Sequence, residues 1–200
     1  MLSKPFSQQL HDWLISKEPK TLHGLIDHFA EKSFAVLFLV LMAIPALPLP
    51  TGGVTHVFEI IAMLLALELI AGVNQVWLPK RWGRLKPSTK LQSSTLPSLI
   101  KAVRKVGRLS HPRLRSLFKN RIAIIIIGLV IFVLALFAFL APPFSGLDTL
   151  PSLGVVLISL AIILDDFILF LLGLVVGFAG IGLIVGTAKV LVNLTSNSLF

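Results

Sequence analysis

Six ionisable side chains lie in or beside long apolar segments, where a charge is costly and marks a candidate site. They are His56, Glu59, Glu68, Asp148, Asp165 and Asp166. His56 precedes Glu59 by three positions, so both side chains would share one face of a helix. Such a pair could relay protons or bind a cation. The alternative is that Glu59 occupies the first turns of a helix, where the helix dipole favours a carboxylate.

Glu68 has a less specific setting. It follows Glu59 by nine positions, which places it on the opposite helix face and about 13 Å further along, so the two cannot form one acid–base pair. Glu68 either serves transport or reaches the headgroup region, where it could pair with Lys80 or Arg81.

Asp165 and Asp166 follow an unbroken apolar run. Adjacent residues point in different directions on a helix, so one aspartate is expected to cap the next helix, and the other needs a partner or water. Asp148 is interpreted as an ordinary turn or N-cap residue. The residues predicted to handle a proton or ion are therefore His56, Glu59, Glu68, Asp165 and Asp166.

Apolar helices must position these side chains. The 200 residues are 56% hydrophobic and 14% charged, with a mean hydropathy of +0.93, whereas soluble domains carry about 25% charged residues. Residues 122–141 are long enough to span a bilayer as one helix. We predict an all-α, polytopic membrane protein with further apolar helices over 34–46, 55–72, 152–164 and 167–191.

Prolines and glycines interrupt both halves of the chain. They are Pro45, Pro48, Pro50, Gly52 and Gly53 in the first half and Pro142, Pro143 and Gly146 in the second. Residues 34–46 would extend only about 20 Å, less than the hydrocarbon core. The two helix–break–helix units are therefore either re-entrant or just spanning. Irregular backbone at membrane depth needs protein or water around it, so we expect the breaks to face a central cavity near His56, Glu59 and Asp165.

The two breaks also resemble each other, with Pro50 aligning over Pro143 and Gly53 over Gly146. This pattern favours an internal repeat, a device common in transporters. The alternative is that any two hairpins need turn residues. The expected organisation is one domain with amphipathic helices over 1–33, a membrane hairpin over 34–72, a basic interfacial linker over 73–120, a second membrane unit over 121–191 and a tail over 192–200.

The linker carries most of the positive charge. Residues 80–121 hold 13 of the 18 lysines and arginines, which places them in the cytoplasm by the positive-inside rule. They would attract anionic lipid headgroups, and nucleic-acid binding is not expected. Residues 1–33 lack the apolar core of a cleavable signal peptide, so the spans are expected to be internal. The side of the membrane on which the C-terminus lies is left open.

Glycines recur at GxxxG spacing in the last helix, at Gly173 and Gly177 and again at Gly182 and Gly186. Small residues let membrane helices approach closely. These four are predicted to pack either within the chain or at a homodimer.

The residue patterns favour no enzyme class. There is no cysteine, and no nucleophile–base pair, HExxH or P-loop motif occurs. The five histidines show no metal-ligand spacing. We expect no cofactor, no metal and no enzymatic activity.

The segment PALPLPTGG (45–53), then Gly72 and WLP (77–79), is similar to the first half of the ExoD family of exopolysaccharide-synthesis membrane proteins. LPSLGVVLISLAIILDDFILFLLG (150–173) is similar to the second half, with Pro151, Asp165 and Gly173 matching. The chain departs from the family where it has Glu68 for glutamine, Asp148 for asparagine and Asp166 for glycine. The resemblance covers roughly residues 20–190, and it implies an inner-membrane role in exopolysaccharide production.

Three functional hypotheses follow. The first is a transporter- or channel-like protein for a proton, an ion or a polar-headed lipid. The second is a non-transporting scaffold whose basic linker recruits polysaccharide-synthesis proteins or anionic lipid. The third is a membrane enzyme acting on a lipid carrier.

Overall fold

The computed structural model describes residues 32–47, 54–73, 120–142 and 145–198, together with Asp12, Val76, Lys101 and Lys105. Within these residues the chain forms α-helices and no strands, which confirms the predicted all-α class. The predicted helices over 1–33 and most of the basic linker lie outside the described residues. So do several of the predicted break residues, namely Pro48, Pro50, Gly52, Gly53 and Pro143.

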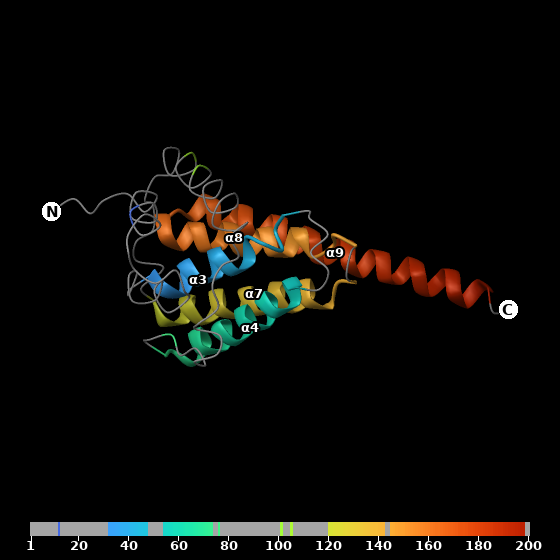
Figure 1. Cartoon of the computed structure of the whole chain (residues 1–200), viewed down its shortest axis with the longest axis horizontal. Helices are drawn as coiled ribbons and strands as arrows, with labels where there is room; N and C mark the ends of the chain where they lie inside the picture. The colour runs from blue at the N-terminus through green and yellow to red at the C-terminus, as the bar shows by residue number, and fades with distance from the viewer. Residues whose placement is uncertain are drawn as a thin grey trace.

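Five helices make up the described structure, and Figure 1 gives their labels. They are α3 (Ser33–Met42), α4 (Val54–Ala71), α7 (Arg121–Leu140), α8 (Thr149–Leu164) and α9 (Phe167–Ser198). Helices α3, α7 and α9 run in one direction, and α4 and α8 run in the other (Figure 1). The result is an antiparallel bundle in which α9 continues past the ends of its neighbours.

Helix α3 is the centre of this bundle. Every residue from Ala35 to Met42 is at most 4% exposed, because α3 packs against both α4 and α8. A helix that is apolar on all sides is stable only when it is surrounded. The ten residues of α3 extend about 15 Å, and the chain then turns through Ala43–Ala46.

The bundle has two ends with different chemistry. At the first, Lys32, Leu69, Ile124 and Ile162 line one small cavity of about 130 Å³. We call this the linker end, since α4 ends and α7 begins there. At the second, the start of α4 meets the end of α7 and the start of α8. We call it the turn end, because both proline-containing turns lie there (Figure 1).

Two helices are long and apolar enough to cross a membrane, α7 and the Phe167–Asn193 part of α9. Only a third of each apolar window is buried against the rest of the chain. Exposed large apolar residues such as Ile126, Leu129 and Val175 occupy the remainder. An apolar outer surface of this kind suits lipid contact rather than water.

Several helix boundaries differ from the predicted ones. Helix α8 begins at Thr149, three residues before the predicted start, and includes Pro151 in its first turn. Proline is tolerated there because the N–H groups of a first turn have no intrahelical acceptor. Helix α9 continues to Ser198, seven residues beyond the predicted Leu191.

Helices α8 and α9 approach each other through glycines. A Cβ atom added to Gly154 would lie 2.6 Å from the Cα atom of Gly177, and one added to Gly173 would lie 3.0 Å from the Gly154 carbonyl oxygen. Gly180 sits equally close to Pro151. By contrast, Cβ atoms added to Gly182 and Gly186 would meet nothing within 4 Å among the described atoms.

We expect Gly154→Ala to destabilise the protein, because the new methyl group would collide with the backbone of α9. Overpacking of this kind typically costs about 1–3 kcal/mol. Gly182→Ala is the matched control, since its methyl group has free space and alanine favours the helix. Thermal unfolding in detergent, followed by circular dichroism, should show a lower midpoint for Gly154→Ala only. Equal midpoints for the two variants would contradict the close approach.

Candidate functional site

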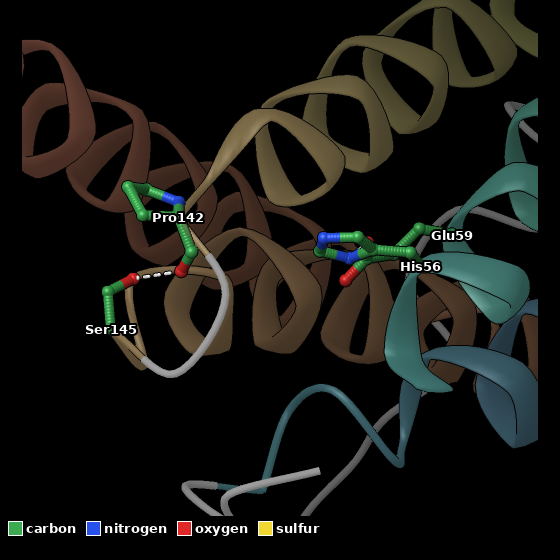
Figure 2. Close-up of polar contacts among 4 residues, drawn as sticks. All are labelled: His56, Glu59, Pro142 and Ser145. Atoms are coloured by element: carbon green, nitrogen blue, oxygen red, sulfur yellow. Dashed lines mark hydrogen bonds and ion pairs between the residues drawn. The ribbon is translucent and has the colours of Figure 1, made fainter. Parts of the chain in front are cut away.

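The turn end contains a buried histidine–carboxylate pair. His56 and Glu59 lie one turn apart at the start of α4, with His56 Nδ1 3.0 Å from Glu59 Oε2. Figure 2 shows both side chains directed to the same place, beside the Pro142–Ser145 turn that follows α7. The spacing of three residues produces this contact, because i and i+3 positions are neighbours on a helix.

The two members of the pair differ in their access to solvent. The Glu59 side chain is 0% exposed, whereas that of His56 is 27% exposed. The His56 ring also packs against Phe139 near the end of α7, with ring centroids 5.3 Å apart. His56 therefore separates the buried carboxylate from the surface of the turn end.

Glu59 is only partly satisfied by His56. Its second oxygen, Oε1, is buried and has no hydrogen-bond partner among the described residues. The hydroxyl oxygens of Thr149 and Ser152, in the first turn of α8, are also buried, and they too have no hydrogen-bond partner among the described residues. Buried oxygens of this kind are usually satisfied by water, an ion or a proton.

Asp148 joins the pair from the α8 side. It precedes the first residue of α8, and its carboxyl interacts electrostatically with His56 and with Glu59. Burial raises the pKa of the Asp148 carboxyl above its ordinary value. The sequence predicted Asp148 only as a turn or N-cap residue, and its position at the N-cap of α8 agrees with that. Its proximity to His56 could not be predicted, because it depends on how α4 and α8 pack. Within the described residues, no three His, Asp or Glu side chains are arranged to hold a metal ion.

Asp165 lies elsewhere, at the opposite end of α8. It ends that helix in the left-handed conformation, with φ of 56° and ψ of 37°. Its carboxylate is 3.7 Å from the ammonium group of Lys32, which also donates a 2.7 Å hydrogen bond to the Ile163 carbonyl oxygen. The structure therefore separates Asp165 from His56 and Glu59 by the length of α8, about 24 Å, and gives it a partner that sequence analysis did not identify.

Asp166 caps the next helix. Its Oδ1 accepts hydrogen bonds from the backbone N–H groups of Ile168, at 2.9 Å, and Leu169, at 3.4 Å. An aspartate at an N-cap satisfies N–H groups that lack an intrahelical acceptor. The two adjacent aspartates thus end one helix and begin the next, and neither reaches the turn end.

The remaining predicted residues lie at different places in the bundle. Glu68 lies near the end of α4, away from Glu59 and close in sequence to Gly72, over which the Arg121 guanidinium packs. Pro45 lies in the turn after α3, while Pro142 and Gly146 flank the turn before α8. The Pro142 carbonyl oxygen accepts a 2.6 Å hydrogen bond from Ser145 Oγ (Figure 2).

A family model and a named relative both identify the same family. The ExoD family, described as "Exopolysaccharide synthesis, ExoD", matches residues 6–186. Protein ExoD of Rhizobium meliloti is 31% identical over 172 residues, covering 81% of this chain and 70% of that protein. A Synechocystis protein, named Uncharacterized protein slr1875, is 26% identical over 167 residues, covering 80% of this chain and 76% of that protein.

No solved structure matches the chain significantly. The family match spans most of the 200 residues, including all five described helices except the end of α9. It confirms the resemblance inferred from the broken segments. The chain belongs to the ExoD family of exopolysaccharide-synthesis proteins.

Proposed function

We propose that this chain is a multi-pass protein of the bacterial inner membrane that carries protons, with His56 and Glu59 as the groups that take them up and release them. The observation that supports this most directly is the buried Glu59 carboxylate. One of its oxygens is paired with His56, and the other has no hydrogen-bond partner among the residues that the structure describes. A carboxylate inside an apolar bundle is costly, so it is retained where it serves a function.

The chemistry of the pair suits a proton. Histidine changes its charge between about pH 5 and 8, and a directly hydrogen-bonded carboxylate can exchange a proton with the imidazole. The half-buried ring of His56 would receive a proton from the turn end and pass it to Glu59. The hydroxyls of Thr149 and Ser152, which have no hydrogen-bond partner in the described parts of the chain, would offer further hydrogen-bonding positions at the turn end.

The charge distribution supports an orientation. The basic linker joins the helices at one end of the bundle, so the positive-inside rule places the linker end in the cytoplasm. The turn end, with His56 and Asp148, would then face the periplasm. Because α7, α8 and α9 alternate in direction (Figure 1), three crossings would put the C-terminus on the periplasmic side.

Proton flux into vesicles tests this proposal. Purified protein is reconstituted with a pH-sensitive dye inside, the membrane potential is clamped with potassium and valinomycin, and an acid pulse is applied outside. We expect faster internal acidification than in protein-free vesicles. Glu59→Gln should return the rate to the protein-free level, because an amide cannot bind and release the proton.

Glu68→Gln is the matched control, with the same substitution on the same helix but away from the pair. It should retain wild-type flux. If wild-type protein moves protons no faster than empty vesicles, the transport proposal is wrong. The scaffold hypothesis would then gain support if neutralising Lys101 and Lys105 abolished exopolysaccharide production while Glu59→Gln did not.

We also expect His56 and Glu59 to be coupled energetically. His56→Phe should destabilise the protein by about 2 kcal/mol, because it removes the hydrogen-bond partner of a buried carboxyl group. Adding Glu59→Met should recover part of that loss. A double-mutant cycle, measured by denaturant unfolding in detergent, checks this; additive effects, within about 0.5 kcal/mol, would show that the pair is not coupled.

A further inference from the structure

A second feature of the turn end lies outside the proton pair. A groove runs between the end of α7 and the C-terminal half of α9, lined by Phe137, Leu140, Ile184, Val185, Ala188, Lys189, Val192 and Asn193. Its volume is about 460 Å³. Most of the lining is apolar, and Leu140 and Val192 are more than half exposed. Lys189 supplies the positive charge of the lining.

The charge of Lys189 has no acidic residue near it in its own helix, because no acidic residue follows Asp166 in the sequence. The ion pairs Lys32–Asp165 and His56–Glu59, in the part of the chain that the structure describes, do not involve Lys189. A lysine in an apolar groove therefore needs an external anion or water to satisfy its ammonium group.

Two helix lengths would put this lysine at a membrane surface if α7 and α9 cross the bilayer. Lys189 follows Phe167, the first residue of α9, by 22 residues, which corresponds to about 33 Å along the helix. Leu140, in the same groove, ends a helix of 20 residues, or about 30 Å. Both distances match the thickness of the hydrocarbon core, about 30 Å. The apolar part of the groove would then lie at acyl-chain depth and Lys189 at headgroup depth.

From these observations we propose that the groove between α7 and α9 binds an anionic phospholipid, with an acyl chain along Phe137, Leu140 and Ile184 and the phosphate at Lys189. A zwitterionic lipid could fill the same apolar surface, but it has no net charge to offer the ammonium group. This inference does not depend on proton transport. It depends on the placement of α7 and α9 across a membrane.

Site-specific quenching can test the proposal, because the chain has no cysteine and a single introduced thiol can be labelled cleanly. A fluorophore on Leu140→Cys is reconstituted into phosphatidylcholine vesicles that contain either brominated phosphatidylglycerol or brominated phosphatidylcholine at equal mole fraction. We expect the anionic lipid to be preferred at this position by about fivefold, the effect of one basic residue near the surface. Lys189→Gln should remove the preference without changing the elution volume of the protein.

The control carries the label on Val175→Cys, an exposed position of α9 away from the groove. It should be quenched equally by the two lipids. Equal quenching at Leu140→Cys, or a preference that survives Lys189→Gln, would overturn the proposal. Displacement of the lipid by millimolar inorganic phosphate would also overturn it, since the site would then select a soluble anion rather than a lipid.

Discussion

The close contact between α8 and α9 determines most of the geometry described above. Gly154 and Gly177 bring the two backbones together, at a distance that any larger side chain would prevent. In a membrane, where burial from water gives helices no driving force to associate, such packing is a principal source of stability. The position of α8 then follows. Its first turn carries Asp148 to the His56–Glu59 pair, and its last turn carries Asp165 to Lys32.

The ionisable side chains of the described bundle gather toward its two ends. Helix α3 fills the interior between them with apolar side chains, from Phe34 to Met42. At the linker end, Lys32 pairs with Asp165 and donates a hydrogen bond to the Ile163 carbonyl oxygen in the last turn of α8. The pair at the turn end leaves one carboxylate oxygen of Glu59 without a hydrogen-bond partner among the described residues. This contrast is the reason for proposing the proton site at the turn end rather than at the Lys32–Asp165 pair.

Local patterns predicted the parts of this structure that depend on local spacing. The His56–Glu59 contact follows from an i, i+3 interval, and the capping role of Asp166 follows from its place before an apolar helix. Contacts between distant segments were not predictable in this way. Lys32 and Ile163 are 131 positions apart, and Gly154 has no glycine four residues away to mark it as a packing residue. The GxxxG pattern selected Gly173 and Gly177, which pack on α8, but equally Gly182 and Gly186, which face open space.

The corner between α8 and α9 restricts which residues can occupy position 165. The backbone there is left-handed, a conformation that is costly for most side chains and tolerated by glycine, asparagine and aspartate. The ammonium group of Lys32 requires an oxygen at the same position. Glycine tolerates the left-handed backbone but has no side-chain oxygen for Lys32. Glutamate has the oxygen but disfavours the left-handed backbone. Aspartate and asparagine are therefore the two residue types that meet both demands at this corner.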